Sequence, residues 1–215
     1  VESDYQAYWL NVKNERNHNH KRYLNEIEFS DLKVFNIILN SLPDNSSLQL
    51  GNSSIVRYVQ LFDITTALDV YCNRGTSGID GSTSTAIGFA NISKKRTLFI
   101  TGDISFFYDS NALWNNYLRN DFRIILINNG GGGIFKFIPG PSSTNVLEYF
   151  DTPHHLTAKH LCKMYNLKYI SVTNEKQLNL ELKSFYIKSD RPKLLEVFTP
   201  NQINDTILKT YFSNL

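Results

Sequence analysis

Short apolar runs alternate with helical stretches along most of the chain. The runs have the length and the apolar composition that are typical of buried strands. They lie at Ser47–Leu50, Leu68–Tyr71, Leu98–Ile100, Ile124–Ile127, Lys168–Ser171 and Lys193–Phe198. No hairpin turn joins two of them, and parallel strands need a longer, usually helical, crossover. The pattern therefore predicts an α/β fold: a doubly wound parallel sheet with helices on both faces.

Helices are expected between the strands. Ser30 suits the N-cap of one helix and Asn174 the N-cap of a later one. The expected helices are Phe29–Leu42, a stretch that opens at Ile55, Ser82–Asn91, the crossover Ser110–Arg119, Leu156–Tyr165, Glu175–Lys188 and a terminal helix from Pro200. Pro139–Pro153 is expected to be an irregular loop that lines the site, and His154, His155 and His160 are expected in capping or surface roles.

The stretch from Thr97 to Phe137 is the one around which the chain is organised. Its two strands end at Gly102-Asp103 and at Asn128-Asn129. The carboxyl ends of parallel strands share one edge of a sheet, and ligands bind at that edge in open α/β folds. We therefore expect Asp103 and Asn129 to meet at this edge.

The residues of this stretch suit a hard divalent cation. The carboxylate of Asp103, the amide oxygen of Asn129 and a backbone carbonyl, that of Gly131, form an oxygen-only set for Mg²⁺ or Ca²⁺. The glycines at 130–133 let the backbone turn tightly. Ser105 can donate to a phosphate, helped by the N-terminus of the following helix. The alternative is a plain strand–turn–helix with a capping Asp and a glycine loop.

Two further loops at strand ends are rich in small and hydroxyl residues. Gly51–Ser54 can bond a phosphate or a substrate carboxylate, and Arg57 projects one turn beyond it. The loop Asn73–Ser82 holds three glycines, which is more than a turn needs, and it includes Arg74. Either arginine could instead be an ordinary surface charge.

Composition and charge exclude several classes of protein. The 215 residues can bury the core of a large domain, and 41% of them are hydrophobic. The net charge is +2 without a basic stripe among aromatics, so no nucleic-acid partner is expected. No apolar run approaches the length of a membrane span, so we expect no integral membrane segment. Cys72 and Cys162 are outside any C-x-x-C pair and are expected to be reduced, buried thiols of a cytoplasmic protein.

Residues 1–29 differ from the rest of the chain, because they are polar and charged, with an apolar island at Tyr8, Trp9 and Leu10. We expect an amphipathic helix or a linker from a missing preceding domain here, and one domain over residues 30–215. The chain does not begin with Met. This suggests a piece cut from a longer protein, although processing would leave the same trace.

Four phrases, in this order, carry a resemblance to a known family. They are LGNSSIVR (Leu50–Arg57), NRGTSGIDGSTSTAIG (Asn73–Gly88), TGDISFFYDSNALW (Thr101–Trp114) and INNGGGGIFKFIP (Ile127–Pro139). The set resembles the C-terminal, diphosphate-binding domain of the 2-succinyl-5-enolpyruvyl-6-hydroxy-3-cyclohexene-1-carboxylate synthases of menaquinone biosynthesis, which are thiamine-diphosphate enzymes. The likeness in motifs covers most of Leu50–Pro153, and the remainder matches only in strand–helix rhythm.

The resemblance implies a transferase that carries out a two-substrate carboligation. Thiamine diphosphate, held with Mg²⁺ or Mn²⁺, decarboxylates 2-oxoglutarate, and the resulting carbanion-like intermediate adds to isochorismate. A homo-oligomer, dimer or tetramer, is implied for the parent enzyme, together with N-terminal pyrimidine-binding and middle domains that are absent here. The glutamate that activates the cofactor lies in that N-terminal domain. We therefore assign no catalytic residue in this chain and expect the fragment alone to be inactive.

The family's binding residues can be carried over position by position. The resemblance implies that Asp103, Asn129 and the Gly131 carbonyl hold the metal, and that Ile79 is an apolar wedge that keeps the cofactor bent. Arg57 and Arg74, with Ser53, would bind substrate carboxylates. The implied cofactor-binding residues are Asn52, Ser53, Ser77, Gly78, Ile79, Gly102, Asp103, Ile104, Ser105, Asn129, Gly131, Gly132, Gly133, Ile134 and Phe135. The departure from the broader cofactor family is Ile104, where Gly is usual.

Three alternatives stay open at this point. Another thiamine-diphosphate 2-oxoacid decarboxylase, or an acetolactate-synthase-like ligase, would share the Asp–Asn–Gly set but is not expected to carry the paired arginines. A non-catalytic phosphate- or nucleotide-binding module could keep the fold for regulation. A purely structural α/β domain would leave the polar glycine loops at three strand ends without a reason.

Overall fold

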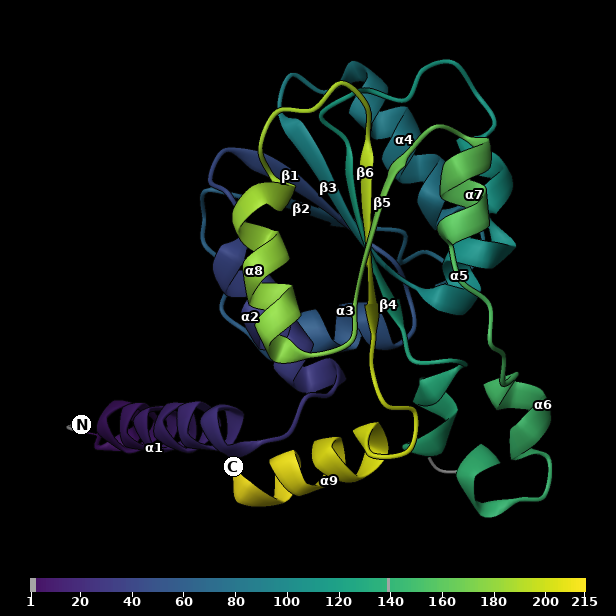
Figure 1. Ribbon diagram of the computed structural model, residues 1–215. Coiled ribbons are helices and arrows are strands. Elements are labelled where there is room, and N and C mark those ends of the chain that lie inside the picture. Colours follow the sequence, from purple (N-terminus) through teal and green to yellow (C-terminus); the bar gives the residue numbers. More distant parts are fainter. Residues whose placement is uncertain (1–2, 139) are drawn as a thin grey trace.

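A six-stranded parallel sheet runs through the computed structural model, which describes residues 3–138 and 140–215 (Figure 1). The strand order is β2-β1-β3-β4-β6-β5, and every neighbouring pair is parallel. The strands are β1 (Ser46–Leu50), β2 (Asp69–Cys72), β3 (Arg96–Gly102), β4 (Arg123–Asn128), β5 (Lys168–Val172) and β6 (Lys193–Phe198). The predicted α/β fold with a parallel sheet is confirmed.

Helices cover both faces of this sheet. The α-helices of the described chain are α1 (Tyr5–Glu26), α2 (Asp31–Ser41), α3 (Ser54–Val59), α4 (Ser82–Ile92), α5 (Asp103–Tyr108), α6 (Leu147–Asp151), α7 (Lys159–Met164), α8 (Glu175–Phe185) and α9 (Asn204–Asn214). Short 3₁₀ turns are η1 (Ser110–Leu113), η2 (Gly133–Lys136) and η3 (Pro141–Ser143). In Figure 1, α2 and α8 lie on one side of the sheet and α4, α5 and α7 on the other.

Alternate residues of the central strands supply two separate cores. Ile125 and Ile127 of β4 pack with α2, α3, α8 and α9, whereas Ile124 and Leu126 pack with α4, α5 and α7. This alternation follows from the two-residue period of a strand. Because both faces are covered, the strand is apolar at nearly every position, which explains the continuous hydrophobic run that the sequence shows there.

Two predicted helix starts are confirmed by their caps. The side chain of Ser30 accepts a hydrogen bond from the backbone N–H of Lys33, and that of Asn174 accepts one from Gln177. Each cap satisfies a backbone donor that the first turn of a helix leaves unpaired. The helices α2 and α8 therefore begin where the sequence indicates.

The predicted crossover helix at Ser110–Arg119 is wrong. The helix α5 begins directly after β3, a single turn η1 follows, and the chain from residue 114 to residue 122 is irregular. Local polar bonds compete with a helix here, since Asn115 Oδ1 accepts the N–H of Tyr117. The guanidinium of Arg119 instead bonds the carbonyls of Ala90 and Ser93 at the end of α4.

Three other boundaries differ from the prediction. The segment expected to be irregular contains η3 and α6, while Pro139 is outside the described residues. The helix expected at Leu156–Tyr165 is shorter, because Glu196 of β6 accepts the backbone N–H of Ala158 and holds the preceding residues outside the helix. The terminal helix begins at Asn204 rather than at Pro200.

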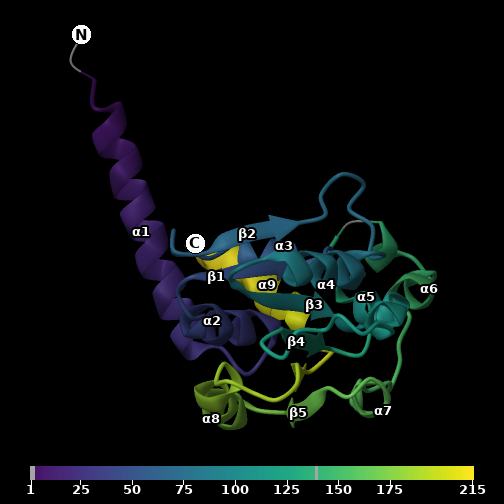
Figure 2. The ribbon, with the colours of Figure 1, turned by 90° about the horizontal axis from the view of Figure 1, so that it is seen from above.

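The helix α1 projects from the body of the molecule (Figure 2). Its last turns pack on α9, where Tyr23 OH donates to the Ile207 carbonyl over 2.7 Å and the His20 ring bonds Tyr211 OH. Its first turns expose Tyr5, Tyr8, Trp9 and Leu10. Within residues 3–138 and 140–215, no helix combines the length and the apolar character that crossing a membrane requires.

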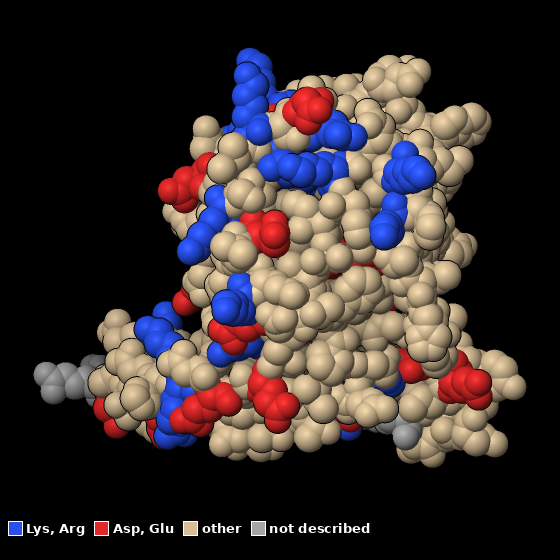
Figure 3. Space-filling model, in the orientation of Figure 1, with Lys and Arg blue, Asp and Glu red and all other residues tan. Residues whose placement is uncertain are grey.

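Basic residues mark the amino-terminal edge of the sheet. Arg96, Arg123, Lys168 and Lys193 are the first residues of β3, β4, β5 and β6. Figure 3 shows Lys and Arg side chains gathered over the upper end of the molecule, where these strands begin. Arg123 is fully buried and donates to the carbonyls of Phe185 and Ile187. Burial lowers the pKa of this guanidinium to about 10.

Burial predicts that the two thiols differ in reactivity. Cys162 is fully buried in the core under α7, and burial raises the pKa of its thiol to about 12. At pH 8 only about 10⁻⁴ of that thiol is therefore ionised, and the thiolate is the reacting species. We expect Ellman's reagent to modify Cys72 but not Cys162 in the native protein. A Cys72→Ser variant that reacted as fast as the denatured chain would contradict this.

Candidate functional site

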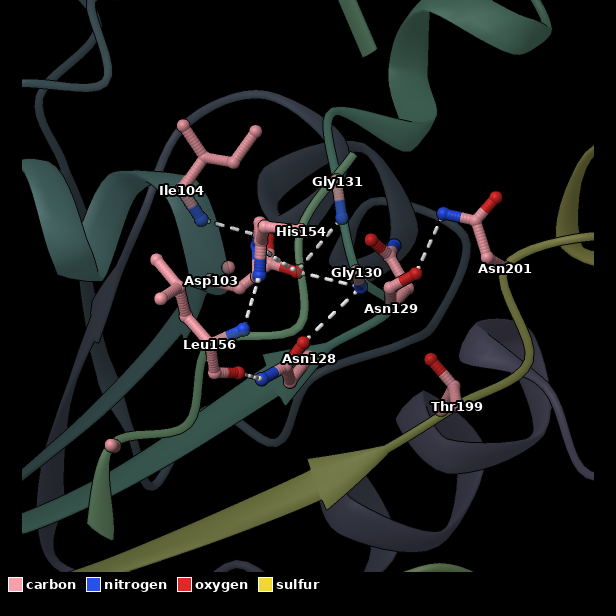
Figure 4. A network of polar contacts seen from close by, with 12 residues as sticks. Asp103, Ile104, Asn128, Asn129, Gly130, Gly131, His154, Leu156, Thr199 and Asn201 are labelled. Carbon is pink, nitrogen blue, oxygen red and sulfur yellow. Dashed lines mark hydrogen bonds and ion pairs between the residues drawn. The ribbon is translucent and has the colours of Figure 1, made fainter. Parts of the chain in front are cut away.

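The ends of β3 and β4 are joined by the carboxylate of Asp103 (Figure 4). Its Oδ2 accepts the backbone N–H groups of Gly130 and Gly131 at 2.9 and 3.1 Å. Its Oδ1 accepts the N–H of Ile104 at 2.7 Å, in the first turn of α5. Asp103 is 3% exposed. This buried carboxylate therefore holds the glycine turn after β4 against the first turn of α5, which follows β3.

The glycine turn needs glycine for two reasons. Gly130 has a φ of +77°, which other residues rarely adopt. A Cβ atom on Gly131 would lie 2.6 Å from the carbonyl oxygen of Asp151, so any larger residue would push α6 away. These glycines bring the backbone close to both Asp103 and the segment before Thr152.

Asn129 directly precedes these glycines in the chain and contacts Asp31 at the start of α2. Its Nδ2 donates to Asp31 Oδ2 at 2.9 Å, and its backbone carbonyl accepts from Asn201 at 2.7 Å. Its Oδ1 is buried and finds no hydrogen-bond partner among the described residues. Buried polar atoms are nearly always paired, so this oxygen is a candidate ligand atom.

His154 approaches the same carboxylate from the far side of the turn. Its Nε2 lies 3.3 Å from Asp103 Oδ2, and its ring packs edge-on against Phe107. The bond to Asp103 raises the pKa of the imidazole above its ordinary value. Its Nδ1 accepts the N–H of Leu156. The expected capping role of His154 is confirmed by its contact with Leu156, and the ring has in addition a contact with Asp103 that the sequence did not indicate.

Glu196 of β6 holds the glycine turn from below. This fully buried carboxylate accepts the side-chain amide of Asn128 at 2.7 Å, together with Thr157 Oγ1 and Tyr169 OH. Asn128 Oδ1 in turn accepts the N–H of Gly130. The strand β6 therefore determines where the turn after β4 lies.

The loops after β1 and β2 are tied together by Asn52. Its buried Nδ2 donates to the carbonyls of Asn73 and Gly78, both at 2.7 Å. Its Oδ1 accepts from Arg74 at 3.0 Å. This one amide draws the glycine-rich loop over the carboxyl end of β1.

Arg57, the other arginine that the sequence indicates, contacts the turn after β1. Arg57 of α3 donates to the carbonyl of Ser53 at 2.8 Å. Both guanidinium groups are on exposed residues, and both are bonded to neutral oxygens of the Asn52–Ser53 turn. Both arginines therefore contact the same turn, Arg57 at Ser53 and Arg74 at Asn52.

Ser105 is bonded differently from what a direct phosphate contact would need. Its hydroxyl donates to the carbonyl of Ile79 at 2.7 Å. The hydroxyl proton is therefore already used, and it fixes Ile79 over the first turn of α5. The backbone N–H of Ser105 is the group that remains for an anion.

These residues surround a cavity of about 150 Å³ at the carboxyl edge of the sheet. The predicted residues that line it are Asn52, Ser53, Ile79, Gly102, Asp103, Ile104, Ser105, Asn129, Gly131, Gly132, Gly133 and Phe135. Asp103 and Asn129 thus meet at one cavity, as expected. In the described chain, the predicted residues Ser77, Gly78, Ile134, Arg57 and Arg74 are outside its wall. Gly78 and Arg74 are bonded to Asn52 just behind it.

The structure adds three residues that the sequence did not indicate, since Asp31, Phe35 and Tyr58 also line the cavity. Phe150 and Thr152 line it too, and they belong to the segment that was expected to do so. Burial raises the pKa of Asp31 to about 6, against the hydrogen bonds from Thr199 and Asn129 that favour its charged form. The ring of Tyr58 stacks on Phe35. Its hydroxyl has no hydrogen-bond partner among the described residues, and burial raises the pKa of this group.

The donor set of this cavity fits a hard cation. Asp103 Oδ1 has one hydrogen bond and therefore a spare lone pair, and Asn129 Oδ1 is unpaired. Among residues 3–138 and 140–215, no group of three His, Cys, Asp or Glu side chains has the arrangement of a metal site. An ion in this cavity would consequently take amide and carbonyl oxygens together with the carboxylate, as Mg²⁺ does.

The chain is similar to curated synthases over nearly its whole length. No family model matches it. It is 55% identical to the 2-succinyl-5-enolpyruvyl-6-hydroxy-3-cyclohexene-1-carboxylate synthase of Flavobacterium psychrophilum over 216 residues. It is 52% identical to that of Christiangramia forsetii over 203 residues, and 43% to that of Porphyromonas gingivalis over 211. The predicted resemblance is confirmed.

The alignments cover nearly all of this chain but only part of each synthase. The alignments cover 100%, 94% and 97% of this chain but only 39%, 35% and 37% of the three synthases. The chain therefore spans less than two fifths of the length of these relatives.

Removing the Glu196 carboxylate is expected to destabilise the glycine turn. Glu196→Ala leaves several buried donors without an acceptor, which should lower the free energy of unfolding by about 3–5 kcal/mol. Urea denaturation measures this. The control Glu15→Ala, at an exposed position of α1, should change stability by less than about 0.5 kcal/mol. Equal effects of the two substitutions would contradict the role given to Glu196.

Proposed function

We propose that this chain is the diphosphate- and metal-binding domain of a thiamine-diphosphate-dependent 2-succinyl-5-enolpyruvyl-6-hydroxy-3-cyclohexene-1-carboxylate synthase. The observation that carries the proposal is that Asp103 and Asn129 line one cavity, while the Oδ1 atom of Asn129 has no hydrogen-bond partner among the described residues. Residues 30–215 would form this domain, with residues 1–29 as a helical linker. The pyrimidine-binding and middle domains would belong to the remainder of the longer protein, which we call the parent synthase.

The reaction we propose for the parent synthase joins two acidic substrates. It decarboxylates 2-oxoglutarate and transfers the remaining carbon unit to isochorismate, in menaquinone biosynthesis. Thiamine diphosphate, when bound, supplies the electron sink for this chemistry. The residues of this chain would bind and orient the substrates and the cofactor.

Asp103, Asn129 and the carbonyl of Gly131 are the proposed ligands of Mg²⁺ or Mn²⁺. The first turn of α5, with the backbone N–H of Ser105, would face the diphosphate, since N–H groups at a helix start favour anions. Ile79 would support the cofactor as an apolar wedge, and the Ser105 hydroxyl would keep it in place. Cofactor contacts are likewise proposed for Asn52, Ser53, Ser77, Gly78, Gly102, Ile104, Gly132, Gly133, Ile134 and Phe135.

Arg57 and Arg74 are proposed to bind the carboxylates of the two substrates, beside Ser53. A planar guanidinium binds a carboxylate through two parallel hydrogen bonds, which suits di-acid substrates. Support comes from their position on the Asn52–Ser53 turn at the edge of the cavity.

A second domain would complete the cofactor site. The cavity of about 150 Å³ is smaller than the roughly 300–1,000 Å³ that small-molecule sites usually occupy. We propose that the missing walls come from the pyrimidine-binding domain, in a homodimer or homotetramer. A cytoplasmic location is part of the proposal, and the two cysteines, which are free of disulfides, support it.

Loss of the Asp103 carboxylate is expected to abolish metal binding. In the parent synthase, Asp103→Ala should weaken Mn²⁺ binding in the presence of thiamine diphosphate by more than about 100-fold, since even partners of metal ligands contribute 10–100-fold. Electron paramagnetic resonance of free Mn²⁺ measures the affinity. Asp69→Ala, which removes an exposed carboxylate of β2 paired with Lys95, is the control. Unchanged affinity in Asp103→Ala would refute the metal site.

The isolated chain is expected to be inactive. Purified chain with 2-oxoglutarate, isochorismate, thiamine diphosphate and Mg²⁺ should release no carbon dioxide above background, because the activating glutamate would be in another domain. The parent synthase, assayed alongside, should release carbon dioxide. A second assay that compares isochorismate with pyruvate as substrates should show that the parent synthase prefers isochorismate. Turnover by the isolated chain would refute the proposal that another domain provides the activating glutamate.

A further inference from the structure

Asn129 has a problem that the other proposed ligands do not share. A carboxylate presents an oxygen to an ion in either orientation, and a backbone carbonyl is fixed by the chain. A side-chain amide carries one oxygen and one NH₂ group, and a rotation of 180° exchanges them. Only one of these orientations can ligate a cation, so something must select it.

The carboxylate of Asp31 makes this selection. An ionised carboxylate only accepts hydrogen bonds, so it must face the NH₂ group of Asn129 and not its oxygen. Asn129 Nδ2 donates to Asp31 Oδ2 at 2.9 Å, and Asn129 Oδ1 is left buried and unpaired within the described chain. The two residues are 98 positions apart and line the same cavity.

Asp31 is itself held from two sides. Thr199, just after β6, donates its hydroxyl to Asp31 Oδ1 at 2.5 Å. The backbone N–H of Asp31 donates to Asn204 Oδ1 at 2.9 Å. The residue is 2% exposed at the first position of α2. Its carboxylate therefore has one oxygen for Thr199 and the other for Asn129.

The charge of Asp31 lacks a partner in the structure. None of the ion pairs found in the described part of the chain includes Asp31. A buried carboxylate without a counter-charge is costly, and a neutral side chain would satisfy the same fold at lower cost. A divalent cation beside Asn129 and Asp103 would supply the missing positive charge.

We propose that Asp31 is a positioning residue that fixes the Asn129 amide with its oxygen toward the cation. This inference rests on the proposed metal site, and it adds a residue that acts through Asn129 and is not itself a ligand of the ion. The contact between Asp31 and Asn129 accounts for the burial of Asp31 beside the cavity. A cation bound by Asn129 would both compensate the charge of Asp31 and be the missing partner of Asn129 Oδ1.

A single isosteric substitution tests the proposal. In Asp31→Asn, the new side chain no longer fixes the orientation of Asn129, because its NH₂ group can face Asn129 while its oxygen accepts from Thr199. Asn129 would then turn its own oxygen toward residue 31 and its NH₂ group toward the ion. Mn²⁺ affinity of the parent synthase, measured with thiamine diphosphate present, should fall by about 10–100-fold, as for other residues that orient ligands.

A double variant provides the rescue. In Asp31→Asn with Asn129→Asp, the NH₂ group of residue 31 would donate to the carboxylate at 129, whose other oxygen would face the ion. A carboxylate has no orientation to select, and the pair still carries a single negative charge. We expect the double variant to recover Mn²⁺ affinity to within about threefold of the native protein. A purely structural role of Asp31 predicts no such rescue.

A matched control separates orientation from folding. Asp109 is buried and accepts the backbone N–H and the hydroxyl of Ser84, away from the cavity. Asp109→Asn should lower stability in urea denaturation without changing Mn²⁺ affinity. Asp103→Ala shows in the same assay whether the metal site exists.

The outcomes distinguish the two proposals. Loss in Asp31→Asn with recovery in the double variant supports the positioning role. Native affinity in Asp31→Asn, or failure of the double variant to recover while both variants remain folded, overturns that role. If Asp103→Ala also retains native affinity, the metal site itself is refuted. If only Asp103→Ala loses affinity, the proposed function stands without Asp31.

Discussion

The architecture of the site depends on one carboxylate that joins two strand ends. Asp103 accepts the N–H groups of Gly130 and Gly131, so the ends of β3 and β4 are held together by hydrogen bonds that neither strand could make alone. Charge-assisted bonds of this kind are roughly twice as strong as neutral ones. The position of Asn129 follows from this contact, because it directly precedes the two glycines. The packing of α6 against the turn follows as well.

The sheet separates charges between its two edges. Basic residues begin four strands, whereas Asp31, Asp103 and Asp151 are buried near the opposite edge. Arg123 keeps its charge and donates to backbone carbonyls, which replace the water that this buried guanidinium has lost. Asp151 is paired with Lys136, whereas Asp31 and Asp103 have no Lys or Arg partner within the described chain, and their charges would attract a cation to this end of the sheet. The same fold would therefore provide both the geometry and the charge that the proposed divalent ion requires.

Local signals in the sequence were sufficient for the strands, for two helix caps and for the pairing of Asp103 with Asn129. These depend on short apolar runs and on residues at strand ends, which lie close in sequence to the elements they define. Asp31, His154 and Glu196 could not be predicted in the same way. Asp31 has the appearance of an ordinary acidic residue in the first turn of a helix. Its partner is 98 positions away, and that of Glu196 is 68 positions away. The missed crossover helix at Ser110–Arg119 has a similar cause, since Arg119 bonds carbonyls 26 and 29 residues earlier.

The resting partners of the two arginines have a consequence for ligand entry. Arg57 and Arg74 bond a backbone carbonyl and an amide oxygen, both of which are neutral. An incoming anionic group would compete well against such weak acceptors, because a charged acceptor forms the shorter and stronger bond. Each side chain is already confined near the turn, so less rotamer freedom is lost on capture than from a freely moving guanidinium. The Asn52–Ser53 turn thus holds both guanidinium groups in place through neutral acceptors, which an anionic ligand of the proposed site would displace.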